Sequence, residues 1–345
     1  MYKLILRPFL FLFSPETIHH LIVNLLKLFF ANSLVSSIVK KTFSVENPKL
    51  KRNVFGITFN SPVGFAAGFD KNAEVFNEFA NFGFSHIEIG TVTPKSQEGN
   101  SKPRLFRLKK DKALINRMGF NNKGAMEVAN NLKKKKHKVI IGGNIGKNTN
   151  TPNEDAFNDY AYCFETLFNQ VDYFVVNISC PNIANLSELQ DKNYLIRILS
   201  KLKELNSEKP IQKPILLKIS PDLSNNQLDD IIDVVISLKI DGVIATNTTT
   251  KRDNLKSSKE LIEKDGKGGL SGKPLCDRSN EVIKYISEKS GNAFPIIGIG
   301  GIFSAQDAID KINAGATLIQ LYTGFIYEGP FLVKKINKAL INMTK

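Results

Sequence analysis

The chain has 345 residues and a formal net charge of +14, and its composition excludes several classes of protein. Hydrophobic residues make up 42% and charged residues 23%, so the length suits one large α/β domain with a small accessory piece, or two ordinary domains. The three cysteines and four histidines show no C-x-x-C or H-E-x-x-H spacing. We therefore expect no disulfide framework, no metal site, no iron–sulfur cluster or iron–sulfur partner subunit, and a location on the reducing, cytosolic side.

The positive charge does not indicate nucleic-acid binding. Its densest run, Lys133–Lys138, has no interleaved aromatic residues and closes a helical pattern just before a strand. Lysines at a helix C-terminus interact favourably with the helix dipole, so this run predicts a solvated helix end.

The N-terminal segment, residues 1–45, predicts two amphipathic helices. Ser14-Pro15-Glu16 reads as an N-cap, a proline at the first helical position and an early acidic residue, and a second short helix fits residues 33–41. No uncharged stretch reaches the roughly 18–20 residues of a membrane span. The apolar faces and surrounding lysines favour a segment lying in a membrane interface, and a helical hairpin packed on the main domain is the alternative.

From residue 46 to residue 345, short apolar runs alternate with longer helical patterns. Helical patterns occupy 155–168, 194–205, 227–238 and 305–314, and no clean G-x-G-x-x-G enters a helix, which disfavours a Rossmann domain. Eight βα units predict a (β/α)8 barrel. The eight runs are 63–67, 85–89, 139–143, 172–176, 215–219, 242–245, 295–299 and 317–321.

Polar residues and glycines follow the runs, at the strand ends where barrels of this kind bind ligands. Gly300-Gly301 and residues 322–324 follow the seventh and eighth runs, where glycines let backbone N–H groups approach phosphate oxygens, so we expect a phosphorylated cofactor. Lys218, which projects from the fifth run, predicts stabilisation of negative charge on that cofactor. A Schiff-base lysine of an aldolase-type lyase is the alternative at this point.

The fourth run leads into Asn177-Ile-Ser-Cys-Pro-Asn182, which brings two amides, a hydroxyl and a thiol to one strand end. A thiol there serves as a base or nucleophile if its pKa is lowered. A small buried cysteine before an ordinary turn is the alternative interpretation of Cys180.

The ordered motifs together resemble those of the dihydroorotate dehydrogenase family over nearly the whole chain. The motifs are Ser61-Pro-Val-Gly-Phe-Ala-Ala-Gly-Phe-Asp-Lys-Asn72, Glu88-Ile-Gly-Thr-Val-Thr-Pro94, Lys102-Pro-Arg-Leu-Phe-Arg107, Ile115-Asn-Arg-Met-Gly-Phe-Asn-Asn122, Gly143-Asn-Ile-Gly-Lys-Asn148, Ala245-Thr-Asn-Thr-Thr249, Gly268-Gly-Leu-Ser-Gly272 and Gly298-Ile-Gly-Gly301. The N-terminal helices and the Lys102–Arg107 stretch resemble the membrane-associated, quinone-reducing class.

This resemblance implies FMN as cofactor, (S)-dihydroorotate as substrate and a membrane quinone as acceptor, with the enzyme on the cytoplasmic side of the inner membrane. By the same resemblance His19 and Arg107 line the quinone site, and Cys180 is the catalytic base. The implied FMN-binding residues are Ala66, Ala67, Gly68, Phe69, Asp70, Thr91, Asn144, Asn177, Lys218, Thr246, Gly272, Gly301, Tyr322 and Thr323. The implied orotate-binding residues are Lys71, Asn116, Arg117, Met118, Gly119, Phe120, Asn177, Asn182, Asn247 and Thr248.

The sequence departs from the quinone-reducing class at the base. That class usually carries Ser-Ser-Pro-Asn-Thr, whereas this chain has Cys180 at the base position and Ile183 in place of the Thr. Cysteine is a better base than serine near neutral pH, so we interpret the two changes as coupled, with no relay Thr required. Cys-Pro-Asn followed by an aliphatic residue is typical of the soluble class, so a soluble enzyme that uses fumarate is the alternative.

Overall fold

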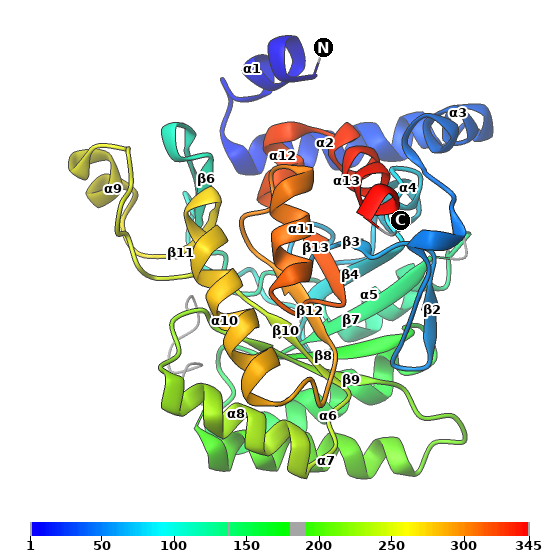
Figure 1. The fold of residues 1–345 in the computed structure, drawn as a ribbon, viewed down its shortest axis with the longest axis vertical. Helices are drawn as coiled ribbons and strands as arrows, with labels where there is room; N and C mark the ends of the chain where they lie inside the picture. Colours follow the sequence, from blue (N-terminus) through cyan, green and yellow to red (C-terminus); the bar gives the residue numbers. More distant parts are fainter. Residues whose placement is uncertain (1, 137–138, 180–190, 344–345) are drawn as a thin grey trace.

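The centre of the protein is a closed barrel of eight parallel strands, seen in a computed structural model that describes residues 2–136, 139–179 and 191–343 (Figure 1). Every strand overlaps one of the predicted apolar runs, which confirms the (β/α)8 barrel. In order round the barrel the strands are β3 (Val63–Phe65), β4 (His86–Val92), β7 (Ile140–Ile145), β8 (Tyr173–Asn177), β9 (Ile215–Ile219), β10 (Gly242–Ala245), β12 (Ile296–Ile299) and β13 (Leu318–Leu321).

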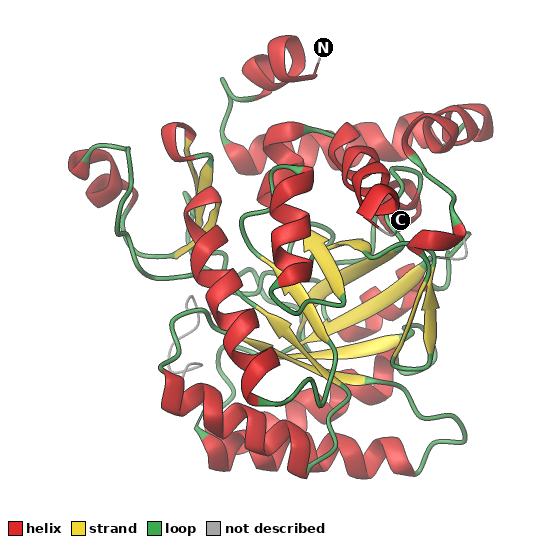
Figure 2. Ribbon diagram, viewed as in Figure 1, coloured by secondary structure: helices red, strands yellow, loops and turns green. Residues whose placement is uncertain are grey.

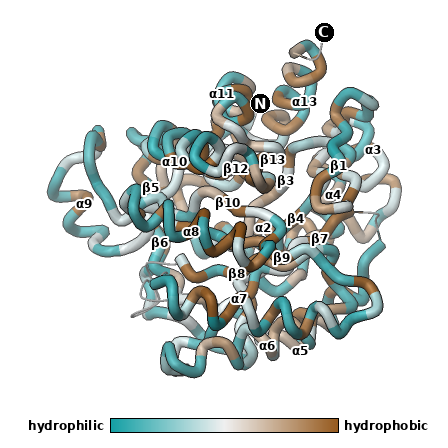
Figure 3. The backbone as a smooth tube through the Cα atoms, turned by 60° about the horizontal axis from the view of Figure 1, so that its bottom comes forward, coloured by the Kyte–Doolittle hydropathy of each residue, from teal (hydrophilic) through white to brown (hydrophobic). Residues whose placement is uncertain are grey.

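Helices surround the barrel (Figure 2). They are amphipathic, so hydrophobic and hydrophilic residues alternate along them in Figure 3; in α8, for example, Leu228, Ile231, Ile232 and Val235 are buried. The four predicted barrel helices are confirmed as α6, α7, α8 and α11. The set comprises α4 (Phe76–Ala80), α5 (Ala125–Leu132), α6 (Ala156–Leu167), α7 (Lys192–Ser207), α8 (Asn225–Ser237), α10 (Cys276–Lys289), α11 (Ala305–Asn313), α12 (Thr323–Glu328) and α13 (Phe331–Met343).

The inside of the barrel changes from apolar to polar along the strands. Side chains alternate between the two faces of a strand, so Leu216 and Leu318 share a face with Lys218 and Gln320, two residues further on. The apolar layer, at the amino end, also contains Val175. The polar layer therefore lies at the carboxyl ends of the strands.

A hairpin that the sequence did not predict packs against the amino end of the barrel. It consists of β1 (Arg52–Val54) and β2 (Ile57–Phe59), which pair antiparallel. Val54 and Phe59 belong to the same apolar cluster as the barrel interior. This end of the barrel is filled with side chains, which leaves the carboxyl end for ligands.

A second unpredicted sheet stands beside the carboxyl end. It joins β5 (Leu105–Leu108), β6 (Ala113–Asn116) and β11 (Gly269–Gly272) in antiparallel order, with β6 in the middle. The short helix α9 (Lys259–Asp265) precedes β11 and projects from the body near this sheet (Figure 1). The sheet brings the segment after β4 and the segment after β10 together over one side of the barrel.

The N-terminal segment forms helices over the same end of the molecule (Figure 1). A π-helical turn (Tyr2–Leu6) and α1 (Arg7–Leu10) precede α2 (Pro15–Phe30) and α3 (Ser33–Phe43). Ser14 caps α2 as predicted, because its side chain accepts from the backbone N–H of Thr17. Among the described residues no single helix is long and apolar enough to cross a membrane; the segments Tyr2–Leu10 and Pro15–Phe30 reach that length only as a pair bent by 116°.

Candidate active site

A cavity of about 240 Å³ opens at the carboxyl ends of the strands, between the barrel and α2. Helix α2 contributes Glu16, His19, His20 and Val23 to its wall. Most of the predicted FMN-binding residues line this cavity: Ala67, Gly68, Phe69, Asp70, Thr91, Asn177, Lys218, Thr246, Gly272, Gly301, Tyr322 and Thr323.

The other two predicted FMN-binding residues lie close behind these. The backbone N–H of Ala66 donates to the carbonyl of Leu321, 3.0 Å away, in the β3–β13 pairing. Asn144 is fully buried, and its Oδ1 accepts from the Thr91 hydroxyl at 2.5 Å. Asn144 therefore fixes a lining residue.

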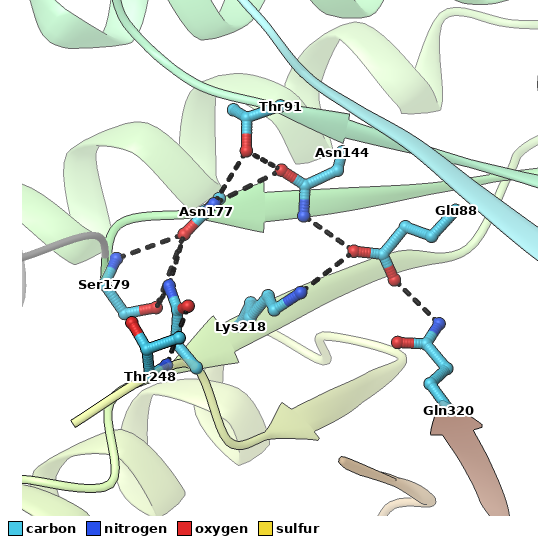
Figure 4. Close-up of polar contacts among 9 residues, drawn as sticks. Glu88, Thr91, Asn144, Asn177, Ser179, Lys218, Thr248 and Gln320 are labelled. Carbon is cyan, nitrogen blue, oxygen red and sulfur yellow. Dashed lines mark hydrogen bonds and ion pairs between the residues drawn. The ribbon is translucent and has the colours of Figure 1, made fainter. Parts of the chain in front are cut away.

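A chain of amide and hydroxyl groups crosses the cavity floor (Figure 4). The side-chain N–H of Asn177 donates to the Thr91 hydroxyl at 2.8 Å and to Asn144 Oδ1 at 3.3 Å. The side chain of Asn247 donates to Asn177 Oδ1 at 3.4 Å and to the Ser179 hydroxyl at 3.0 Å. These contacts fix the orientations of the amides before any ligand enters, which reduces the cost of binding a planar polar molecule.

Below this chain a buried carboxylate collects donors from three other strands (Figure 4). Glu88, in the middle of β4, accepts from Asn144 at 2.7 Å, from Gln320 at 2.8 Å and from the Lys218 ammonium at 3.2 Å. The side chains of Glu88 and Lys218 are 0% and 5% exposed, so the pair is a buried salt bridge.

A glycine cradle forms another wall of the cavity. Gly301 has φ of +74°, and a Cβ there would lie 2.4 Å from Cys276 Cα. Gly272 has φ of +110° and equally lacks room for a side chain. Only glycine leaves the backbone N–H groups of such loops open to phosphate oxygens. The cradle and the preset amides fit a phosphorylated, planar cofactor.

A buried lysine supports this cradle from below. Lys311 is 0% exposed, and its ammonium donates to the Ser279 hydroxyl at 2.9 Å and to Asn280 at 2.7 Å. Ser279 in turn donates to the carbonyl of Ile299, next to Gly300. Burial lowers the pKa of Lys311 to about 8.

The predicted orotate-binding residues of the described chain come from the ends of β6 and β8 and from the loops after β3, β6 and β10. Lys71 donates to the side chain of Asn121, and the backbone N–H of Thr248 donates to Asn247 Oδ1 at 2.9 Å. Arg117 instead donates to the carbonyls of Asp265 and Lys267 and stacks over the Phe106 ring. Cys180 and Asn182 lie outside the described residues. The cavity lining includes Lys71, Asn116, Met118, Gly119, Phe120, Asn177, Asn247 and Thr248.

The loop after β3 is held by a buried carboxylate. Asp70 accepts from the backbone N–H groups of Glu74 at 2.6 Å and Val75 at 2.8 Å. Burial raises the pKa of Asp70 to about 6, although both hydrogen bonds oppose the rise. Asp70 therefore orders the loop that presents Phe69 and Lys71 to the cavity.

The two predicted quinone-site residues occupy different places: His19 is on α2, and Arg107 is on β5. His19 lines the cavity, and its ring lies 4.5 Å from that of Phe69 in an edge-on contact. Burial, with the nearby charges of His20 and Lys71, lowers the pKa of His19 to about 4, so the imidazole is neutral at physiological pH. Arg107 donates to the carbonyl of Phe13 at 2.6 Å and lies over the Phe11 ring.

Ion pairs fix α2 over the cavity at both ends. Glu16 pairs with Arg104, whose guanidinium is 2.7 Å away and only 7% exposed, while Lys102 approaches the same carboxylate at 3.7 Å. Near the other end, Lys27 pairs with Glu74. Although burial alone would raise it, hydrogen bonds from lysines hold the pKa of Glu74 at about 2.

Comparison with known proteins decides the family. The family model described as dihydroorotate dehydrogenase matches residues 49–343. The chain belongs to the dihydroorotate dehydrogenase family.

Its relatives include proteins of the same length. The chain is 57% identical over 341 residues to a curated protein of Christiangramia forsetii named dihydroorotate dehydrogenase (quinone), with 99% of each chain covered. A protein of the same name from Coxiella burnetii is 47% identical, over 97% of this chain and 95% of that one. The structure resembles that of Eimeria tenella DHODH in complex with ferulenol, with a TM-score of 0.81, 34% identity, and 91% and 90% of the two chains covered.

Sequence reasoning missed several residues of this dihydroorotate dehydrogenase site. Glu88 and Gln320 sit inside apolar runs and read as strand interior, although a charged residue between Ile87 and Ile89 needs a partner if it is buried. Lys218, a second charged residue inside an apolar run, was the sequence signal that could have identified the partner of Glu88. Lys311 lies within a helical pattern, where a lysine normally faces water.

Proposed function

We propose that this protein oxidises (S)-dihydroorotate to orotate, holds FMN as its resident cofactor, and passes the electrons to a membrane quinone. The reaction is the redox step of de novo pyrimidine synthesis. The observation that supports this most directly is one cavity with a glycine cradle, preset amides and Lys218 on its barrel side, and α2 on its other side. The two curated relatives named dihydroorotate dehydrogenase (quinone) support the same assignment.

The reaction removes a hydride from C6 of dihydroorotate and a proton from C5. FMN, when bound, supplies the acceptor for the hydride. The cradle of Gly272 and Gly301 would hold its phosphate, and Lys218 would oppose the negative charge that reduction places on the cofactor. Because that charge is buried with the lysine, the interaction is stronger than in water.

The amides of the cavity would bind the planar anionic product. Asn116, Asn177 and Asn247 offer both donors and acceptors, and Lys71 adds a positive charge. A site built from such groups discriminates strongly against analogues that lack the matching polar atoms. Orientation of the substrate would be the main contribution of these residues.

The proton from C5 would go to Cys180, a proposal that rests on the sequence. The thiolate form is the base. A cysteine with the ordinary pKa of about 8.5 already has a small thiolate fraction at neutral pH. Ile183 offers no hydroxyl for a relay, so the thiol formed when Cys180 accepts the proton would release it to solvent without that help.

Residues 1–45 would form the membrane-associating unit and the route of the quinone. Large apolar side chains on this segment are strongly exposed, among them Leu4 at 83%, Leu12 at 75% and Leu28 at 68%. Such a surface suits insertion into the headgroup region of a bilayer, here the cytoplasmic face of the inner membrane. The neutral His19 ring and Phe69 would line the quinone path, with Arg107 holding the turn at Phe13.

The test is anaerobic turnover of dihydroorotate by detergent-purified protein. Flavin content is measured first, and the acceptor is either a short-chain quinone analogue or fumarate. We expect yellow protein with bound FMN and turnover that depends on quinone. Efficient turnover with fumarate would instead favour the soluble-class alternative, which Cys180 and Ile183 suggest.

A further inference from the structure

Glu88 is an acidic residue at the centre of the barrel for which substrate binding and proton transfer give no role. Its carboxylate is 0% exposed and lies behind the cavity wall, whereas two of its donors, Lys218 and Gln320, line the cavity. Its third donor, Asn144, holds Thr91 and Asn177 in place (Figure 4). All three side chains that donate to Glu88 among the described residues therefore line the cavity or hold residues that line it.

The charges in this cluster are unequal in their exposure to the cavity. Lys218 lines the cavity, and the carboxylate of Glu88, which does not, lies 3.2 Å from its ammonium. Asn144 and Gln320 contribute dipoles and no net charge. The lysine and the glutamate together are neutral, so a ligand above them experiences the lysine charge reduced by the glutamate.

We propose that Glu88 is a positioning residue that sets the reduction potential of the bound flavin. It aims Lys218, Asn144 and Gln320, and it offsets the lysine charge so that the reduced cofactor is not stabilised too strongly to pass its electrons on. This inference rests on the proposed function, because it assumes that a flavin binds above Lys218.

A purely structural role for Glu88 leads to a different expectation. If Glu88 only ordered its neighbours, any substitution in the cluster would loosen flavin binding. The reduction potential would then change in the same way whether or not the substitution removes a charge. If its charge matters, removing the charge raises the potential, because Lys218 then attracts the negative charge of the reduced cofactor without opposition. The sign of the shift separates the two roles.

The decisive variant is Glu88→Gln in the FMN-loaded protein. The side chain keeps its shape, and rotation of the Gln320 amide lets its oxygen face the new amide nitrogen, so each hydrogen bond of the cluster has a counterpart. The potential is measured by equilibration with a reference dye. We expect reduced FMN to bind about 10-fold more tightly relative to oxidised FMN, which raises a two-electron potential by about 30 mV.

The matched control is Gln320→Met, which removes a donor to the same carboxylate and changes no charge. We expect its potential to stay close to that of the wild type. An unchanged or lower potential in Glu88→Gln, or an equal rise in Gln320→Met, would overturn the inference.

If Glu88→Gln does not retain flavin, Lys218→Gln gives the answer. The carboxylate is then unopposed, so the potential falls below that of the wild type, and the double variant Glu88→Gln/Lys218→Gln, which also removes the carboxylate charge, should regain part of that loss; equal potentials in the single and double variants overturn the inference. Dye equilibration needs no dihydroorotate. A wild-type protein that binds FMN without being reduced by dihydroorotate would therefore contradict the proposed function and leave this test intact.

Discussion

The barrel floor beneath the cavity and the N-terminal segment above it differ in how their side chains are covered: the floor pairs its charged groups inside the protein, and the N-terminal segment leaves large apolar groups exposed. On the floor, the buried Glu88 and Lys218 contact each other and their neighbours. In the N-terminal segment, Leu4, Leu12 and Leu28 face outward with more than two thirds of their surface exposed. The floor is complete within the chain, whereas the helices present a surface that a partner outside the chain would cover. The proposed function makes use of this contrast, with substrate chemistry in the first region and acceptor delivery in the second.

Replacing Cys180 tests the barrel side of this division. We expect Cys180→Ala to slow flavin reduction by dihydroorotate about 1,000-fold, because a general base contributes roughly 10²–10⁴-fold. Cys180→Ser should also be badly impaired, since Ile183 provides no relay. Stopped-flow flavin absorbance measures both variants. Cys163→Ser, at a buried thiol on α6, is the matched control. A serine variant that reduces flavin at nearly the wild-type rate at neutral pH would contradict the coupling of Cys180 with Ile183.

Removing residues 1–42 tests the proposed role of the N-terminal helices. We expect quinone-dependent turnover to fall by at least about 10-fold, since the route over α2 and the apolar surface are lost. Flavin reduction by dihydroorotate should survive, because the barrel floor is self-contained. Steady-state assays with a quinone analogue, beside single-turnover flavin reduction, separate the two effects. Equal loss of both would show that the regions are not independent.

The ion pair between Glu16 and Arg104 links the two regions. Both side chains are largely buried, so Arg104→Met should destabilise the docking of α2 by about 3 kcal/mol. Hydrogen exchange of the α2 amides measures the change. Lys102→Met is the matched control, because Lys102 approaches the same carboxylate from a position 66% exposed and should contribute less than about 1 kcal/mol. Similar exchange in both variants would contradict a special role for Arg104.

A pH titration tests the interior near the amino end of the barrel. Burial lowers the pKa of His86 to about 3. The neutral imidazole thus contributes stability that is fully present above pH 6.5 and is lost as the pH falls towards 3. The loss reaches about 2 kcal/mol at pH 5. Urea unfolding at pH 7 and pH 5 should show this loss in the wild type and not in His86→Gln.

The sequence predicted the barrel well because each strand is a short apolar run and several of these runs are followed by a helix of clear amphipathic period. The β1–β2 hairpin and the β5–β6–β11 sheet were missed for a physical reason. Their strands are three or four residues long, and the latter sheet joins segments from distant parts of the chain, so its pairing leaves no local pattern. For the site, strand-end residues such as Thr91 and Asn177 were predictable, since the fold alone places them at the cavity.

Interior polar residues were harder to predict. Glu88 and Gln320 occupy positions that look apolar in the sequence, and only the closed barrel brings them within 2.8 Å of each other. Arg117 shows the reverse difficulty. It lies in a motif whose neighbours line the cavity, yet its side chain turns to the carbonyls of the loop before β11. Chain neighbours in a loop do not share a direction, and a sequence gives no direction by itself.

The pairing that closes the barrel also has a consequence for synthesis on the ribosome. β3 pairs with β13, and the Tyr2 hydroxyl donates to the carbonyl of Ile326, 324 residues along the chain. Such distant contacts form only when the last part of the chain has emerged. The segment around Tyr2 therefore leaves the ribosome well before α12, the helix near the C-terminus on which it docks. If the N-terminal helices bind the membrane as proposed, they would be available to a lipid surface while the end of the barrel is still being made.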